Sequence, residues 1–248
     1  MNRLRSSVAM FAVAAAALVF ADKADAVVVG QLDTFQDGTT SNWQNGEAGN
    51  AVPVANIATG GPAGAGDRYI RLTADGSSSG GKLTVWNRDQ WLGDYVGQNI
   101  TTIEVDLRNE GAVALSIRLA FKTGPGGSVP GFLTPAMLLP VGSGWQHFSI
   151  SIVPSNLIPI NNPGPWASFF IGEVRFIHEV GASNLSGDNV VGMLGIDNIR
   201  AVPEPATSAL FVGGLLALVL PYLRARRQRA SQPIPSSAPN FLPRSSRG

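Results

Sequence analysis

The stretch Ile100-Thr-Thr-Ile-Glu-Val-Asp-Leu-Arg108 decides the fold, because apolar and polar residues alternate along most of it. In an extended strand successive side chains point to opposite faces, so this alternation predicts a strand with one buried and one solvated face. A second alternating run, Ala114 to Lys122, follows after Asn109-Glu110-Gly111, a tripeptide that is typical of a hairpin turn. The two runs together predict a β-hairpin.

The rest of the chain between residues 27 and 200 has the same character. The sequence holds 29 glycines and 17 prolines, which favours many turns over long helices. Further strands are predicted at Val27–Phe35, Arg68–Thr73, Gly81–Trp86, Met137–Pro140, Trp145–Ile152, Glu173–His178 and Leu194–Ile199. Many short strands without a long amphipathic helix predict an all-β domain over residues 27–201, built as a two-sheet, jelly-roll-like sandwich.

The composition narrows the classes of function. The 248 residues carry a formal net charge of +1, and only 14% of them are charged. A protein that binds nucleic acid needs a basic face for the phosphates, so this balance argues against a nucleic-acid partner. Cysteine is absent, which excludes disulfides and thiolate metal sites.

Residues 1–26 have the three parts of a secretory signal peptide. Arg3 and Arg5 form a positive start, and Val8 to Phe20 is an unbroken apolar run that is short for a membrane span. Ala24-Asp25-Ala26 then supplies the small-x-small pattern at which signal peptidase cleaves, so the mature chain is predicted to begin at Val27. The alternative is an uncleaved membrane anchor.

A second apolar stretch lies near the other end of the chain. Ala206 to Leu223 contains no charge and would be about 27 Å long as a helix, enough to cross the hydrocarbon core of a membrane. It is followed at once by Arg224, Arg226, Arg227 and Arg229. The positive-inside rule keeps such a cluster in the cytoplasm, which places the preceding domain on the other side of the inner membrane. Both ends of the chain therefore predict export of residues 27–201.

Directly before this stretch stands Val202-Pro203-Glu204-Pro205, and with it the chain resembles the PEP-CTERM sorting family. The resemblance covers residues 202–229 and consists of Pro203-Glu204-Pro205, the apolar helix and the arginine cluster, in that order. It implies that an exosortase recognises the tag in a Gram-negative bacterium that exports polysaccharide. The helix would then anchor the protein transiently, before release to the cell surface or the extracellular matrix. The Ser/Pro-rich residues 230–248 are predicted to be a disordered tail.

The predicted sandwich is also similar to galactose-binding-like and carbohydrate-binding jelly rolls. The similarity lies in Asp33-Thr-Phe35, Asp37-Gly38 and Trp43 near the start, and in Gly195-Ile-Asp197-Asn-Ile199 near the end. It implies that the first and last strands lie side by side, and that Asp33 and Asp197 hold a structural calcium ion with help from the turn at Asp37. The alternative is that Asp33 caps a turn and Asp197 bonds the backbone at a strand end.

One segment is rich in the side chains that bind sugars. Trp86, Arg88, Trp91 and Tyr95 fall within ten residues, together with Asn, Asp and Gln side chains that can bond hydroxyl groups. Exposed Trp and Tyr rings would stack on pyranose rings, which predicts a glycan-binding platform. The alternative places the same rings in the core, where tryptophan usually lies. The pattern leaves the side of Trp145 open.

No residue is assigned a catalytic role. The two histidines, His147 and His178, belong to no zinc-binding spacing, and no Gly-x-Ser-x-Gly motif is present. Most acidic side chains fall in turns or on outward strand faces, where solvation explains them.

Three hypotheses of function follow. The first is a non-catalytic glycan-binding or structural module that is exported, sorted and associated with extracellular polysaccharide. The second is a hydrolase that acts on polysaccharide, and the third is a protein-adhesion module without a small ligand. Glycan binding predicts exposed aromatic rings on one sheet or at the loop ends, and a hydrolase predicts two acids facing each other in a cleft.

Overall fold

The computed structural model describes residues 26–45, 52–77, 81–126 and 128–203. Residues 1–25 of the predicted signal peptide, the sorting tag from Glu204 onward, the apolar stretch 206–223 and the tail lie outside the described residues. Within the described ranges, no helix is long and apolar enough to cross a membrane. The account below therefore concerns the middle domain.

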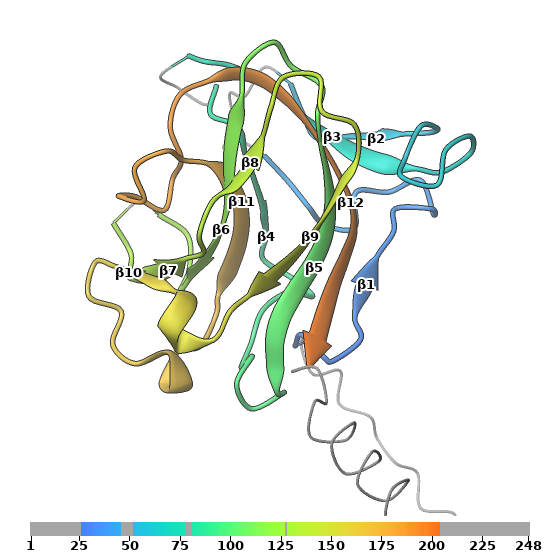
Figure 1. Cartoon of the computed structure of the whole chain (residues 1–248). Helices are drawn as coiled ribbons and strands as arrows, with labels where there is room; N and C mark the ends of the chain where they lie inside the picture. Colours follow the sequence, from blue (N-terminus) through green and yellow to red (C-terminus); the bar gives the residue numbers. More distant parts are fainter. Residues whose placement is uncertain (1–25, 46–51, 78–80, 127, 204–248) are drawn as a thin grey trace, which may run out of the picture. The chain divides into compact units, whose positions relative to one another are not determined.

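The first sheet is antiparallel and contains the strand predicted from residues 100–108 (Figure 1). Its order is β2 (Ala55–Ile57), β3 (Tyr69–Asp75), β12 (Val191–Pro203), β5 (Ile100–Asn109) and β9 (Gln146–Ser151). The short strand β1 (Leu32–Asp33) also pairs with β12. The longest strand, β12, thus holds the N-terminal segment, β3 and β5 together.

The second sheet packs against the first and is also antiparallel. Its order is β10 (Ile158–Ile160), β7 (Gly131–Leu133), β6 (Leu115–Lys122), β11 (Glu173–His178) and β4 (Thr84–Asn87), and β8 (Met137–Leu139) pairs with β6. Two single-turn 3₁₀ helices, η1 (Pro154–Asn156) and η2 (Trp166–Ser168), lie in the connections around β10. The predicted hairpin of these two strands is wrong: β5 pairs with β12 and β9, and β6 pairs with β11, β7 and β8, so the turn after β5 carries the chain from the first sheet to the second.

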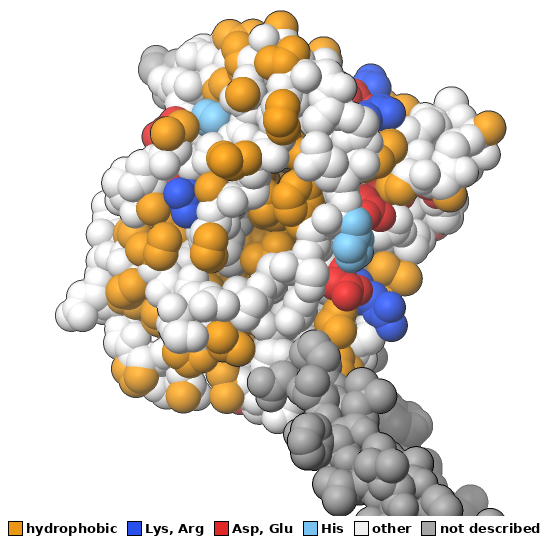
Figure 2. Space-filling view, viewed as in Figure 1, with side chains coloured by type: hydrophobic (Ala, Val, Ile, Leu, Met, Phe, Trp, Pro, Cys, Tyr) orange, Lys and Arg blue, Asp and Glu red, His pale blue; other side chains and the backbone are white. Residues whose placement is uncertain are grey.

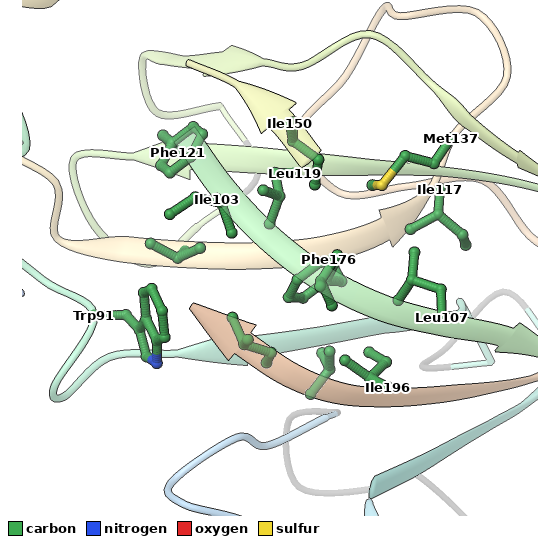
Figure 3. Close-up of a cluster of buried hydrophobic side chains, with 14 of the residues drawn as sticks. Trp91, Ile103, Leu107, Ile117, Leu119, Phe121, Met137, Ile150, Phe176 and Ile196 are labelled. Carbon is green, nitrogen blue, oxygen red and sulfur yellow. The ribbon is translucent and has the colours of Figure 1, made fainter. Parts of the chain in front are cut away.

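The core lies between the sheets and is filled by the apolar side chains of alternate positions (Figure 3). Ile103 and Leu107 of β5 face Ile117 and Leu119 of β6, and all four are at most 2% exposed. Truncating one such side chain to alanine typically costs about 2–5 kcal/mol of stability, because the transfer energy is lost and a cavity is left. The alternation in the sequence therefore corresponds to the stabilising core.

The predicted fold class is confirmed: the domain is all-β with two antiparallel sheets in a sandwich. The prediction for the N-terminal strand was too long, since only Leu32–Asp33 of Val27–Phe35 is strand. Gly30 has a φ of 83° and Phe35 a φ of 58°, both in the left-handed region, which interrupts the regular extended backbone on either side of Leu32–Asp33. The three-residue strands β2, β7 and β10 were not predicted, because runs so short carry little period-two signal.

The first and last strands lie side by side, as the similarity to carbohydrate-binding jelly rolls implied. Leu32 pairs with Arg200 and Asp33 with Ile199. A register shift between Asp197 and Arg200, with Asn198 at a φ of 52°, kinks β12 at this point. The strand then continues to Pro203, the first residue of the Pro-Glu-Pro motif and two residues beyond the predicted domain end.

Candidate functional site

The predicted sugar platform at residues 86–95 is wrong in its geometry. Trp91 and Tyr95 are each 1% exposed and Trp86 is 7% exposed, so none of the three offers a ring face to a sugar. Trp91 and Tyr95 belong to the main core, where burial of their large apolar area outweighs any ligand role. Only Arg88, with 35% of its side chain exposed, remains within reach of a ligand.

The indole N–H groups explain why Asp33 is buried. Trp43 and Trp91 each donate from Nε1 to Asp33 Oδ2 over 2.7 Å, and Gln90 Nε2 donates to the same oxygen over 3.1 Å. Burial raises the pKa of Asp33, and the hydrogen bonds from Trp91, Trp43 and Gln90 act in the opposite direction. Asp33 thus fixes two core tryptophans, a role that the sequence did not indicate.

Asp197 has a different environment. Its carboxylate is fully buried, Oδ1 accepts a hydrogen bond of 2.8 Å from the Asn198 backbone N–H, and Oδ2 has no partner among the described residues. Burial, together with the charges of Asp67 and Asp106, raises the pKa of Asp197 to about 7. A buried carboxylate oxygen without a donor is what a missing cation would leave behind.

The surroundings of Asp67 supply further oxygen atoms. Gln36 Nε2 lies 2.6 Å from Asp67 Oδ1, 3.2 Å from the Thr34 carbonyl and 3.3 Å from the Arg68 carbonyl. The described residues hold no group of three acidic or histidine side chains placed to bind a metal. An ion near Asp197 would therefore need carbonyl oxygens, which calcium accepts and most transition metals do not. Asp33 Oδ2 already accepts three hydrogen bonds, whereas Asp197 Oδ2 accepts none from the described residues, so of the two acids Asp197 fits a cation better.

A polar cleft of about 440 Å³ opens beside the N-terminal segment. Its acids already have local partners: Asp37 accepts from the Thr39 backbone and hydroxyl over 2.9 Å, and Asp89 accepts from Asn42 over 2.5 Å. The hydrogen bonds from Thr39 hold the pKa of Asp37 below its usual range. The cleft is lined by Asp33, Asp37, Thr39, Thr40, Ser41, Asn42, Asp89 and Gln90. These carboxylates stabilise turns, and their arrangement favours a structural role over a catalytic one.

Trp145, which precedes β9, is the only one of the five tryptophans that is partly exposed. Its Nε1 donates to the Gly60 carbonyl over 2.8 Å, and its ring meets Tyr69 edge-on at 5.1 Å between centroids. The Arg108 guanidinium lies 4.9 Å from the ring centroid. Below the ring lies Gly195, where a Cβ would come within 3.0 Å of the indole. Trp145 is therefore held in one orientation on the outer face of the first sheet.

Hydrogen-bonding groups surround this ring. Glu110 accepts from Arg71, from Arg108 and, over 2.8 Å, from the Tyr69 hydroxyl. Burial would raise the pKa of Glu110, but the hydrogen bonds from Arg108 and Arg71 outweigh it and hold the pKa below its usual range. The Arg71 and Arg108 side chains keep 34% and 26% of their surface exposed. An aromatic ring with fixed donors and acceptors around it can bind a sugar.

The histidines differ in their surroundings. His147, on the outer face of β9, is 58% exposed and its Nδ1 lies 2.9 Å from Asp106 Oδ1. His178 is buried, its Nδ1 accepts from the Ser116 backbone over 3.0 Å, and burial lowers its pKa. His178 is thus structural, whereas His147 adds an accessible polar group to the face that carries Trp145.

A second hollow, of about 280 Å³, lies between β8 and β9 on the face seen in Figure 2, which shows a central apolar depression. Met137, Leu138, Phe148 and Ile150 line it, together with small and polar residues. Phe148 is its one aromatic side chain, and no charged side chain lines the hollow, whereas the ring of Trp145 has both an indole N–H and charged neighbours. The glycan-binding candidate is therefore the face around Trp145.

No protein-family model matches the chain and no curated protein matches its sequence, so the resemblance to the sorting family rests on residues 202–229 themselves. Among solved structures, the chain is similar to an exo-β-agarase, with 14% identity and a TM-score of 0.50, over 71% of this chain and 26% of that one. It is also similar to a family 11 carbohydrate-binding module from Clostridium thermocellum in complex with a mixed-linked tetrasaccharide, with 15% identity and a TM-score of 0.45, over 71% and 97% of the two chains.

A further similar structure is a family 28 carbohydrate-binding module specific for non-crystalline cellulose, with 15% identity and a TM-score of 0.43, over 71% and 97% of the two chains. At these identities the likeness concerns the fold, a two-sheet sandwich of the jelly-roll kind.

Proposed function

We propose that this protein is exported and sorted to the cell surface or extracellular matrix, where its β-sandwich binds glycan without catalysis through the face around Trp145. The observation that carries the proposal is the state of this ring, which is partly exposed while the other four tryptophans are buried. It is also fixed by Gly60, Tyr69 and Arg108. A ring that is already ordered loses little conformational entropy when a sugar stacks on it.

The polar side chains beside Trp145 suit sugar hydroxyls. Glu110 accepts hydrogen bonds, Arg71 and Arg108 donate them, and His147 can do either depending on its tautomer. All four are on the same outer face, because β3, β5 and β9 present these positions away from the core. A few such groups around an apolar ring give orientation and specificity to a sugar site.

Export and sorting are supported by the two ends of the chain. The residue predicted to begin the mature protein, Val27, is buried, and its backbone N–H donates to the Leu92 carbonyl over 2.8 Å, so it is part of the sandwich. The last strand, β12, runs directly into Pro203 of the tag. Signal peptidase and an exosortase are the proposed processing partners, and the helix at 206–223 is the proposed transient anchor in the inner membrane.

A structural calcium ion is part of the proposal. Asp197 would supply a carboxylate oxygen, and carbonyl and water oxygens would complete the roughly six to eight ligands that calcium takes. The ion would neutralise the buried charge of Asp197.

A glycan array tests the proposed function. The full-length protein, produced in a Gram-negative host and purified in mild detergent, is expected to bind neutral or acidic polysaccharides. Trp145→Ala is expected to lose at least about tenfold in affinity, since stacking on an aromatic ring contributes about 1–3 kcal/mol where flat ligand rings have been measured. The matched control is Phe170→Ala, because Phe170 is 64% exposed and lies outside this face.

The outcomes separate the hypotheses. If Trp145→Ala and the wild type bind glycan with equal affinity, the binding site does not include Trp145. Absence of binding across the array would favour adhesion without a small ligand. Release of reducing ends from a bound polysaccharide would support the hydrolase instead.

A further inference from the structure

Three cations converge on one carboxylate at the outer face of the second sheet. Lys122 Nζ lies 2.8 Å from Glu173 Oε1, and Arg175 and Arg88 donate from Nε to the two oxygens of the same carboxylate. Glu173 pairs with Lys122 across β11 and β6, and Arg175 pairs with Trp86 across β11 and β4. Glu173, Lys122, Arg88, Arg175 and Trp86 are here called the Glu173 cluster.

The Glu173 cluster has more positive than negative charge. Glu173 is the only carboxylate among the described residues that forms an ion pair with any of the three cations, so two positive charges have no counterpart. The Glu173 and Lys122 side chains are fully buried and Arg175 is 10% exposed, so water screens the excess poorly. Burial lowers the pKa of Lys122, and the neighbouring charges of Arg175 and Arg88 act in the same direction. Such an environment attracts an anion.

The two guanidinium groups also have donors to spare. Of the N–H groups that each carries, only Nε–H has a hydrogen-bond partner in the described part of the chain. The planar fork of an arginine binds both oxygens of a carboxylate, and it matches sulfate and phosphate groups in the same way. Two such forks beside an excess of positive charge can bind an anionic group.

Trp86 fixes the arginines in place. The Arg88 guanidinium carbon lies 4.9 Å from the ring centroid of Trp86, and that of Arg175 lies 5.4 Å from it. Stacking on a buried ring orders both side chains before a ligand arrives, which lowers the entropic cost of binding. Arg88 is the accessible member, with 35% of its side chain exposed.

We propose that the Glu173 cluster binds the acidic groups of a polysaccharide, such as uronate carboxylates or sulfate esters, at a second site on the sheet face opposite to Trp145. This inference rests on the proposed glycan-binding function and names the chemical class of the glycan. Arg88 and Arg175 bind the anion, and Trp86 and Glu173 position them.

The test compares three polymers and one free ion. Affinities of the full-length protein are measured for a polyuronate, a sulfated galactan and an uncharged galactan, and thermal stability is measured with and without sodium sulfate. We expect the acidic polymers to bind at least about tenfold more tightly than the uncharged one, since a charge-assisted bidentate contact is among the stronger hydrogen bonds. Their affinity should fall as salt rises.

Arg88→Gln removes one charge and one fork at the accessible position. It is expected to abolish the preference for acidic polymers and to leave the affinity for uncharged galactan unchanged. The matched control is Arg200→Gln, which removes the same charge from an exposed position on the first sheet. Trp145→Ala should weaken binding of uncharged polymer and leave the Arg88-dependent salt sensitivity in place.

The outcomes distinguish this inference from the proposed function. Binding of uncharged galactan without preference for acidic polymers overturns the anion site and leaves the proposed function intact. If no polymer binds, the proposed function fails. Stabilisation by sulfate that Arg88→Gln removes and Arg200→Gln keeps then supports an anion site for a smaller ligand, and equal stabilisation of all three proteins overturns it.

Discussion

The two outer faces of the sandwich each carry a cluster of one glutamate, several cations and aromatic rings, and the clusters differ in how completely their donors are used. On the first sheet, Glu110 binds Arg71 and Arg108 beside Tyr69 and Trp145. On the second, Glu173 binds Arg88, Arg175 and Lys122 beside Trp86. Arg108 uses all three of its nitrogens within the protein, since Gly60 and Tyr69 also accept from it. Arg88 uses one.

The difference indicates which kind of ligand each cluster can bind. In the cluster around Glu110 the Trp145 ring is partly exposed, and two arginines face one carboxylate, so one positive charge is in excess. In the Glu173 cluster the ring is buried and two positive charges are in excess. The first arrangement suits stacking of an uncharged sugar ring, and the second suits an anion.

The largest expected effect is that of removing the central carboxylate. Glu173→Gln should lower the free energy of unfolding by about 3–5 kcal/mol, because it leaves the buried Lys122 and Arg175 without a counter-charge. Glu110→Gln should cost only about 1–2 kcal/mol, since Arg71 and Arg108 can turn toward water. Urea unfolding of both variants at neutral pH measures the difference. A larger loss for Glu110→Gln would contradict the contrast between the clusters.

Asp197 contrasts with Glu173, because it is a buried carboxylate that has no cationic side chain as a partner among the described residues. Its raised pKa means that the folded state binds a proton that the unfolded state has released, so without metal the stability should fall as pH rises from about 4 to 7. In EDTA, Asp197→Asn should raise the free energy of unfolding at pH 8 by about 2–4 kcal/mol and leave it nearly unchanged at pH 4.

Calcium should remove the advantage that Asp197→Asn has over the wild type at pH 8 in EDTA. If the ion binds, it stabilises the wild type at pH 8 and leaves Asp197→Asn unaffected, as seen in melting temperatures with calcium and with EDTA. Identical melting of the wild type in both conditions would remove the calcium proposal. A pH-independent effect of Asp197→Asn in EDTA would instead mean that the carboxylate has a partner in solution.

The smallest expected effect concerns the exposed arginines. Arg71→Gln should cost about 1 kcal/mol, because it removes bonds to Glu110 and to the Tyr69 hydroxyl. Arg88→Gln should change the unfolding free energy by less than about 0.5 kcal/mol, because lost attraction to Glu173 is offset by relief of repulsion among three cations. Thermal unfolding of the two variants side by side gives the comparison. A cost for Arg88→Gln above that of Arg71→Gln would mean that Arg88 is structural.

Sequence reasoning succeeded where a local period carried the information. The alternation around Ile103, Val105 and Leu107 predicted a strand and its buried face, and all three side chains are at most 2% exposed. The same period could have placed Trp145: it falls in step with the outward His147 and out of step with the buried Ile150 and Ile152.

Sequence reasoning failed where a residue type permits two environments. Trp91 and Tyr95 have the composition of a sugar site, but their burial depends on Asp33, which lies 58 residues before Trp91 and accepts its indole N–H. Asp33 was predicted to bind calcium, and a carboxylate in a sequence does not reveal which donors will reach it. These groups meet because the N-terminal segment bonds to the loop after β4, through the Val27 N–H to the Leu92 carbonyl and the Gln31 amide to the Gln90 carbonyl.

The sequence by itself determined the sandwich, because a period of two depends only on the geometry of an extended chain. It also carried both predicted export signals, which are read as linear segments. The tertiary structure decided which tryptophan remains at the surface and which charges meet. Lys122 and Glu173 are 51 residues apart, and Arg88 and Glu173 are 85 apart. Contacts over such separations come from strand order and register, which local patterns do not encode.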